Sequence, residues 1–411
     1  MKAIKHKLGE LLRVTRGASL PGTGYADSGK YLRLTLANFQ EEGGFKEFKS
    51  TQGKFFVESF DSRFLMHKGD LITPLTEQSP GLLGSVAFVP CDGLYIQSQD
   101  VGLISCNTEM LDKRFAYYLF LTHSVREQIS ARSQQTKIRH TSPDKIADVE
   151  VYLPDLPTQL RIAGVLGSID EKIELNRKKI AELEALAKTI YDYWFVQFDF
   201  PDANGKPYKS SGGKMVWNEL LKRAMPVGWD VKRLPEIADY LFGYPFDSSL
   251  FNDKGYGFPI VRIRNVKDGV TQDSTTESAN KEYIISDGDF LIGMDGYFDM
   301  NHWIGGDAYL VQRTCRIKTK QSLYAGWLSS ALQAPIKHLE KSLSGATLAH
   351  LGKAHLDEIM LPVPPNDMRQ SLSILNQAIE RKVTLGSENI ALTQQRDSLL
   401  PLLMNGQVVV G

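Results

Sequence analysis

A polar segment between residues 130 and 145 carries side chains that can form hydrogen bonds with nucleic-acid bases. Its sequence, SARSQQTKIRHTSPDK, contains Arg132, Gln134, Gln135, Lys137, Arg139 and His140. Arginine and glutamine can form paired hydrogen bonds with the edges of guanine and adenine, whereas lysine, serine and threonine bind phosphates. A solvated surface loop is the simpler explanation for any one of these residues, so the hypothesis of DNA contact depends on whether the set recurs.

A matching set of polar residues occurs in the second half of the chain. The segment SLSGATLAHLGKAH (residues 342–355) contains Ser344, Thr347 and His350. The stretches RIRNVKDG and DGYFDMNHW add Arg262, Arg264, Asn265, Tyr297 and Asn301, and TEQSPG adds Thr76 and Gln78 to the first half. Because the two sets occupy corresponding places in the two halves, we predict that these residues contact DNA.

The correspondence comes from a long internal repeat, which aligns the two halves of the chain. The aligned pairs are VEVYLP (149–154) with IMLPVP (359–364), HKGDLI (67–72) with SDGDFLI (286–292), YLRL (31–34) with IVRI (260–263), and LGELLRVTRG (8–17) with LPEIADYLFG (234–243). Each copy contains short alternating runs typical of strands, then a helical stretch, a polar loop, a further strand and a long helix. We therefore expect two similar mixed α/β globules.

Motifs for catalysis are missing from the sequence. GYADSGKY (residues 24–31) resembles a phosphate-binding loop, but Tyr31 stands where the magnesium-binding Ser or Thr is needed. The histidines lack zinc-ligand spacing, no Gly-x-Ser-x-Gly turn occurs, and no Asn/Asp-Pro-Pro-aromatic tetrapeptide of an amino-methyltransferase is present. We predict no catalytic residue, no metal ligand and no cofactor bound by this chain.

The charge balance is neutral, with 48 Lys and Arg against 48 Asp and Glu. Neutrality argues weakly against nucleic-acid binding, but a local basic face or a partner protein can supply the phosphate contacts. The three cysteines lack metal or disulfide spacing. No apolar run reaches the length of a membrane span and no signal core follows the N-terminus, so we expect a cytoplasmic protein without membrane contact.

Two long helices are expected to position the globules. From residue 162, apolar residues recur at alternating spacings of four and three, a heptad seam that includes Asn176 and ends at Trp194. Asn176 either fixes the register of the seam or simply interrupts it. A weaker seam follows residue 364, where Gly386 is expected to interrupt the helix. Chain connectivity requires the second helix to run back along the first.

The expected fold is therefore α+β, with two similar mixed α/β domains separated by two long helices that form an intramolecular antiparallel coiled coil with approximate two-fold symmetry. The expected segments are residues 1–155 (first globule), 156–200 (central helix), 201–228 (linker), 229–363 (second globule), 364–405 (C-terminal helix) and 406–411 (tail).

The central segment from LPTQLRIAGVLGSIDEKIELNRKKIAELEALAKTIYDYWFVQFDFPD to SSGGKM resembles that of the specificity (S) subunits of type I restriction–modification systems. RDSLLPLLMNGQV (396–408) is similar to their C-terminal region. FGYPF, PIVRIRNVKDG and GDFLIGM resemble the opening of their target recognition domains. This resemblance covers essentially the whole chain.

The resemblance implies a non-catalytic subunit whose two target recognition domains each recognise one half of a split target in double-stranded DNA. It implies that the helices form a spacer that scaffolds two methyltransferase (M) subunits, which bind S-adenosylmethionine, and that restriction (R) subunits, when present, use ATP and Mg²⁺. Tyr193, Trp194 and Phe195 would then dock a methyltransferase subunit. Alternatively, Tyr191, Trp194 and Phe195 cap the coil against the second globule. The alternative function is a protein-interaction adaptor that carries two similar modules and does not bind DNA.

Overall fold

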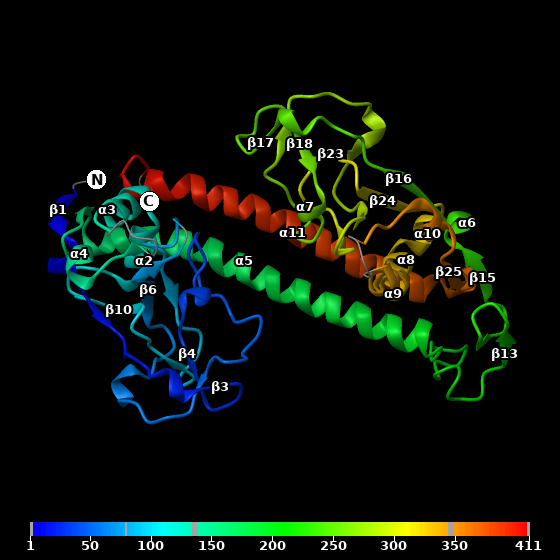
Figure 1. The fold of residues 1–411 in the computed structure, drawn as a ribbon, viewed down its shortest axis with the longest axis horizontal. Helices are drawn as coiled ribbons and strands as arrows, with labels where there is room; N and C mark the ends of the chain where they lie inside the picture. The colour runs from blue at the N-terminus through cyan, green and yellow to red at the C-terminus, as the bar shows by residue number, and fades with distance from the viewer. Residues whose placement is uncertain (1–2, 79, 134–138, 344–348, 409–411) are drawn as a thin grey trace. The chain divides into compact units, whose positions relative to one another are not determined.

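The computed structural model describes residues 3–78, 80–133, 139–343 and 349–408. The chain forms two compact units, Met1–Glu171 with Gln394–Gly411, and Lys172–Thr393. Each unit contains a mixed α/β globule packed on its own segments of the two long helices (Figure 1). The α+β fold class with two similar domains and a helical pair is confirmed.

The first unit contains three main strand groups. A ribbon pairs β1 (Ile4–Lys7) with β12 (Glu150–Leu153). One four-stranded sheet has the order β2 (Leu12–Arg16), β10 (Val101–Cys106), β6 (Leu71–Pro74), β8 (Ala87–Phe88). The other has the order β3 (Tyr25–Ala26), β5 (Phe55–Phe56), β4 (Tyr31–Arg33), β9 (Tyr95–Ile96). The helices are α1 (Leu8–Leu11), α2 (Lys113–Leu121), α3 (His123–Ala131) and α4 (Pro143–Ala147).

The second unit repeats this organisation. Its ribbon pairs β15 (Asp230–Arg233) with β25 (Met360–Val363). The four-stranded sheet has the order β16 (Ala238–Phe242), β24 (Thr314–Thr319), β21 (Phe290–Gly293), β22 (Met300–His302). The further sheet has the order β17 (Phe251–Asn252), β19 (Ser274–Thr275), β18 (Phe258–Val261), β23 (Ala308–Leu310), β20 (Ile284–Ile285). The helices are α6 (Leu234–Ile237), α7 (Ile263–Val266), α8 (Ala325–Ala331), α9 (Gln333–Leu343) and α10 (Lys353–Asp357).

Two glycines mark the same chain crossing in both units. A Cβ atom on Gly17 would lie 2.3 Å from the carbonyl oxygen of Ser98, and one on Gly243 would lie 2.1 Å from that of Val311. Both distances are too short for any side chain, so only glycine allows the two backbones to approach. This match confirms the alignment of LGELLRVTRG with LPEIADYLFG.

The predicted alignment of YLRL with IVRI is wrong by two residues. The side-chain oxygen of Asn38 accepts the backbone N–H of Thr35 at 2.9 Å, and Asn265 accepts that of Arg262 at 2.8 Å. Thr35 therefore corresponds to Arg262. A shift of two preserves the in–out alternation of a strand, so the sequence pattern cannot distinguish the two alignments.

Helix α5 (Leu156–Tyr191) is continuous and leads into a π-helical turn, Asp192–Val196. Helix α11 (Arg369–Met404) is also continuous, so the predicted interruption at Gly386 is wrong. Instead, the glycine makes room for a neighbour, because a Cβ atom there would lie 2.8 Å from the Cδ1 atom of Ile304. Gly386 has a low helix propensity, but its lack of a side chain allows Ile304 of the globule to pack against α11.

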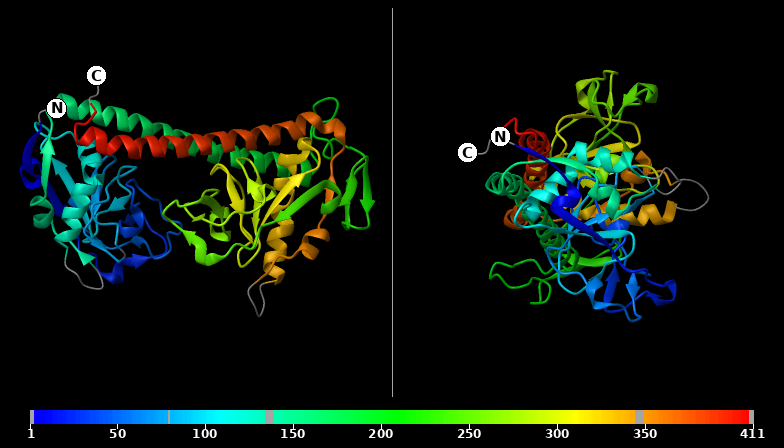
Figure 2. Two further views of the ribbon diagram at one scale, coloured as in Figure 1. Left: turned by 90° about the horizontal axis from the view of Figure 1, so that it is seen from above. Right: turned by 90° about the vertical axis from the view of Figure 1, so that its left-hand side faces the viewer.

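Helices α5 and α11 run antiparallel and side by side within each unit (Figures 1 and 2). In the first unit, Arg396 pairs with Asp170 at 3.0 Å. In the second, Lys382 pairs with Glu184 at 2.6 Å. Also in the second unit, Lys172 pairs with Glu388 at 3.2 Å. Within this unit, therefore, residue numbers rise along α5 as they fall along α11, as predicted from connectivity. The approximate two-fold relation between the units stays a prediction.

Asn176 occupies a fully buried position in the helical seam of the second unit. Its side-chain nitrogen donates to Glu388 at 2.9 Å and to Asn389 at 3.0 Å, both on α11. A shift of either helix along the other would break these bonds. The structure thus favours the register-fixing role of Asn176 over a simple break in the seam.

The segment predicted as a linker contains regular structure. Strands β13 (Met215–Asn218) and β14 (Arg223–Pro226) form an antiparallel hairpin. The ring of Tyr208 stacks on Phe200 with centroids 4.7 Å apart. The domain limits otherwise stay predictions. In the part of the chain that the structure describes, no helix combines the length and apolar character needed to cross a membrane.

Candidate nucleic-acid interface

In the first unit, a buried acid binds Arg139 of the predicted polar segment. Strand β7 (Thr76–Glu77) pairs with β11 (Arg139–His140), which belongs to that segment. Glu77 is 1% exposed and accepts the backbone N–H groups of Gly81, Leu82 and Leu83. It also forms an ion pair of 2.8 Å with Arg139. The Arg139 guanidinium, which further donates to Ser130 and Ser133, therefore ties β11 to the C-terminal end of helix α3.

A second buried acid lies one position away from the corresponding place in the second unit. Leu75 and Met294 make equivalent backbone hydrogen bonds, so Asp295 corresponds to Thr76 and not to Glu77. A strand-like bridge pairs Asp295 with His350, and the Nδ1 atom of His350 lies 2.6 Å from the Asp295 carboxylate. The other carboxylate oxygen accepts a hydrogen bond from Nη1 of Arg313. Burial works to raise the pKa of Asp295, but the bonds from His350 and Arg313 outweigh burial and lower this pKa below its ordinary value of 3.8. Asp295 is thus an ionised anchor for two basic side chains.

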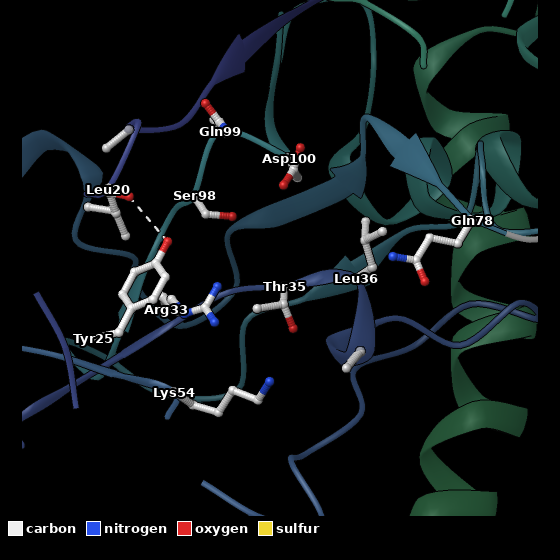
Figure 3. Close-up of a pocket in the computed structure, with 12 residues that line it drawn as sticks. Leu20, Tyr25, Arg33, Thr35, Leu36, Lys54, Gln78, Ser98, Gln99 and Asp100 are labelled. Atoms are coloured by element: carbon white, nitrogen blue, oxygen red, sulfur yellow. Dashed lines mark hydrogen bonds between the residues drawn. The ribbon is translucent and has the colours of Figure 1, made fainter. Parts of the chain in front are cut away.

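A polar pocket of roughly 400 Å³ opens in the first unit (Figure 3). It is lined by Ala18, Leu20, Tyr25, Arg33, Thr35, Leu36, Ala37, Lys54, Gln78, Ser98, Gln99 and Asp100. The guanidinium of Arg33 lies 4.0 Å from the ring centroid of Tyr25, which orients it. Hydrogen-bond donors and acceptors line this pocket, and they include both positively and negatively charged side chains. Recognition of base edges requires donors as well as acceptors.

Among the predicted DNA contacts that the structure describes, Gln78 alone lines the pocket. The sequence reasoning missed Arg33, Lys54 and Asp100, which come from three separate stretches of the chain. The parallel pairing of β4 with β9 brings Arg33 to the same edge as the loop that follows Ile96. No local sequence motif can reveal residues from three separate stretches. The internal repeat did give one signal, because the aligned strand YLRL contains Arg33.

An arginine cluster occupies the corresponding surface of the second unit. Arg264 binds the buried carboxylate of Asp273 through both Nε, at 3.2 Å, and Nη2. Arg262 lies over the ring of Phe251 at 5.5 Å and 3.8 Å from the same carboxylate. Since the Arg264 side chain is 64% exposed, it is available to a ligand.

The remaining predicted residues divide into exposed and structural ones. His140 is exposed and Tyr297 is 77% exposed, so both can contact a ligand. Thr76 is buried in the β7 strand, and Arg132 is half-buried and donates to Gln128.

Two further predicted residues have structural bonds in the second unit. Asn301 donates to the carbonyl of Lys267 and accepts from Lys382, which ties β22 to helix α11. Asn265 caps the short helix α7 through the N–H of Arg262. Gln134, Gln135, Lys137, Ser344 and Thr347 lie outside the described residues.

The aromatic cluster at the end of α5 contains one core residue and one surface residue. Phe195 is 2% exposed and packs against Trp229, with ring centroids 6.1 Å apart. Trp194 is half-buried and Tyr193 is 42% exposed. Phe195 therefore caps the helix against the second globule, and Tyr193 is the member of the trio that a partner can reach.

Two copies of one α/β unit, each with a buried acid bonded to a basic side chain and each packed on the same antiparallel helical pair, define an internally duplicated protein. The chain belongs to the family of the type I restriction modification DNA specificity domain, which matches residues 4–185 and 226–393. It is a specificity subunit of a type I restriction–modification system, and the matched ranges cover both copies of the repeat.

Individual relatives carry the same description. The MjaIX specificity subunit of Methanocaldococcus jannaschii is 24% identical, over 72% of this chain and 69% of the relative. The HindI specificity subunit of Haemophilus influenzae is 22% identical, over 83% of this chain and 87% of the relative. Among solved structures, a type I S subunit from M. genitalium has a TM-score of 0.61 at 19% identity, covering 98% of this chain and 96% of that one. That similarity establishes a shared fold.

Proposed function

We propose that each unit recognises one half of a bipartite target in double-stranded DNA. The observation that supports this proposal is the recurrence of one backbone pairing that carries different side chains in the two units. The acid–base pair on this backbone pairing is Glu77 with Arg139 in the first unit and, at the neighbouring position, Asp295 with His350 in the second. The exposed groups beside the two acid–base pairs differ, with Gln78 in the first unit and Tyr297 in the second. A shared scaffold with different exposed groups suits two different half-sites.

The helical pair is proposed to set the distance between the two half-sites and to scaffold two methyltransferase subunits. Catalysis, S-adenosylmethionine binding and, where a restriction subunit is present, ATP and Mg²⁺ binding are assigned to those partners. The zero net charge of this chain fits such sharing, because partner subunits can supply phosphate contacts.

The test is selection from a pool of randomised DNA duplexes by the complex of this chain with its methyltransferase. Recovery of two short conserved blocks separated by a fixed gap would support the proposal. Binding without any sequence preference, even as salt is raised to weaken phosphate contacts, would contradict it. Failure to bind at low salt would favour the adaptor alternative.

A further inference from the structure

One surface position carries opposite charges in the two units. In the first unit, the carbonyl of Asp100 accepts the N–H of Leu75 at 2.8 Å. In the second, the carbonyl of Arg313 accepts the N–H of Met294 at 2.9 Å. Both residues directly precede the first residue of the paired inner strand, β10 or β24. Asp100 and Arg313 are therefore structural equivalents.

The surroundings of this position match in backbone and differ in chemistry. The N–H of Arg33 donates to the carbonyl of Lys54 at 3.0 Å, as Ile260 does to Asp273. Lys54 in the first unit thus corresponds to Asp273 in the second. The backbone is the same at these two positions, but the side-chain charge is reversed at both. Folding does not require such reversals, so we attribute them to a difference between the ligands of the two units.

Arg313 combines an unusual backbone conformation with an exposed guanidinium group. Its backbone φ is 69°, in the left-handed region that residues other than glycine rarely adopt. Its side chain is 58% exposed, and within the described residues its only hydrogen bond runs from Nη1 to Asp295. The Nε and Nη2 groups remain as a pair of parallel donors, the geometry that binds O6 and N7 of guanine.

Asp100 presents the complementary chemistry. Its half-buried carboxylate lines the same polar pocket as Gln78 and Lys54, and lies near Ser98 and Gln99 in Figure 3. A carboxylate accepts hydrogen bonds but donates none, so it favours the exocyclic amino group of cytosine over the O6 of guanine.

We propose that the position of Asp100 and Arg313 determines base specificity in both units, with Arg313 binding a guanine and Asp100 accepting from a base amino group. This inference rests on the proposed function. It predicts a guanine at one position of the half-site of the second unit, and an amino-bearing base at one position of the half-site of the first.

The test uses Arg313→Gln and Arg313→Lys in the full complex, with DNA pools randomised in both half-sites. Lysine keeps a positive charge that can pair with Asp295 but loses the two-pronged donor edge, so the variant is expected to fold. Both variants should lose roughly tenfold to a hundredfold in preference for guanine at one position of one half-site. The other half-site should be unchanged, and Asp100→Asn should alter that other half-site alone.

Arg233→Gln is the matched control, because Arg233 is an exposed arginine of the same unit on the β15 ribbon. It should leave both half-sites unchanged. An unaltered guanine preference in Arg313→Lys, or an equal loss of affinity for all sequences, would overturn the inference while leaving bipartite recognition intact. A wild-type complex that selects no bipartite sequence would instead overturn the proposed function.

Discussion

At the level of single residues, buried acids decide what the surrounding basic side chains can do. The sequence marked Arg139 and His350 as DNA contacts because of their chemistry. The structure shows both side chains bonded to buried carboxylates, Glu77 and Asp295. Sequence reasoning could not find these partners, because neither acid lies near its basic residue in the chain.

Protonation of His302 should destabilise the second unit in mild acid. Burial first, and then the nearby Lys382 ammonium, lower the pKa of His302 to about 3 from the ordinary 6.5. Between pH 6.5 and 3, His302 is therefore protonated in the unfolded chain and neutral in the folded chain. Its titration leaves the free energy of unfolding unchanged above pH 6.5 and lowers it progressively as pH decreases from 6.5 toward 3. Between pH 7.5 and 5.5 the expected loss is about 1 kcal/mol.

The measurement is urea unfolding followed by tryptophan fluorescence. All five tryptophans, at positions 194, 217, 229, 303 and 327, lie in the second unit, so the signal reports on that unit. The variant His302→Phe, whose ring can pack on Phe290, should lose the extra pH dependence. An equal pH slope in wild type and variant would show that His302 does not titrate in this way.

Replacement of aromatic residues at the end of α5 should separate stability from partner binding. Phe195→Ala removes a core side chain and should reduce the stability of the second unit by about 3 kcal/mol or more. Tyr193→Ala alters an exposed residue and should change stability by less than about 0.5 kcal/mol. Urea unfolding and pull-down of the methyltransferase check both expectations. Full partner binding by Tyr193→Ala would remove this residue from the proposed dock.

At the level of elements, periodicity predicted the helices well and the strand alignments less well. The heptad spacing from Ile162 to Trp194 gave a helix that the structure contains almost to its predicted limits. By contrast, the period-two pattern of YLRL and IVRI permitted an error of two residues, because such a shift leaves every side chain on the same face. The capping bonds of Asn38 and Asn265 resolve that ambiguity.

The polar residue in the seam should cost stability. Within the described residues, the Oδ1 atom of Asn176 is buried without a hydrogen-bond partner. Asn176→Leu should therefore stabilise the helical pair by about 1 kcal/mol, since an apolar side chain suits a buried seam position. Guanidinium unfolding monitored by fluorescence checks this, with Lys179→Leu as an exposed control. Lower stability in Asn176→Leu would mean that the bonds to Glu388 and Asn389 outweigh the buried oxygen.

At the level of the whole molecule, the duplication was visible in the sequence but the pocket was not. The alignment of VEVYLP with IMLPVP, continued toward the N-terminus, pairs His140 with His350, and the structure confirms that these two residues occupy equivalent backbone pairings. Arg33 and Lys54 escaped notice, because two short strands separated by a long loop bring them together. Repeats preserve the order of elements, whereas a binding surface depends on which strands become neighbours.

Shortening both helices by one heptad should shorten the gap between the two DNA half-sites. Removal of Glu171–Arg177 together with Glu388–Gln394 keeps the seam in phase and deletes Asn176 together with its two partners. Seven residues of helix span about 10 Å, which equals about three base pairs of DNA. Selection from randomised DNA should return the same half-sites with a gap about three base pairs shorter.

The same deletion in α5 alone is the control, since it leaves the seams unequal in length and should abolish selective binding. An unchanged gap in the double deletion would show that the helices do not set the spacing.

The division of the chain has a consequence for its biosynthesis. The first unit contains the N-terminal residues together with residues 394–411, and Leu403 and Met404 pack in the same core as Leu8 and Leu11. The second unit is contiguous in sequence. A ribosome that synthesises the chain from its N-terminus therefore releases every residue of the second unit before the first unit is complete. The core of the first unit is therefore completed last, although synthesis of this unit begins first. Until then, apolar surface of the first unit stays exposed, and a chaperone can bind it.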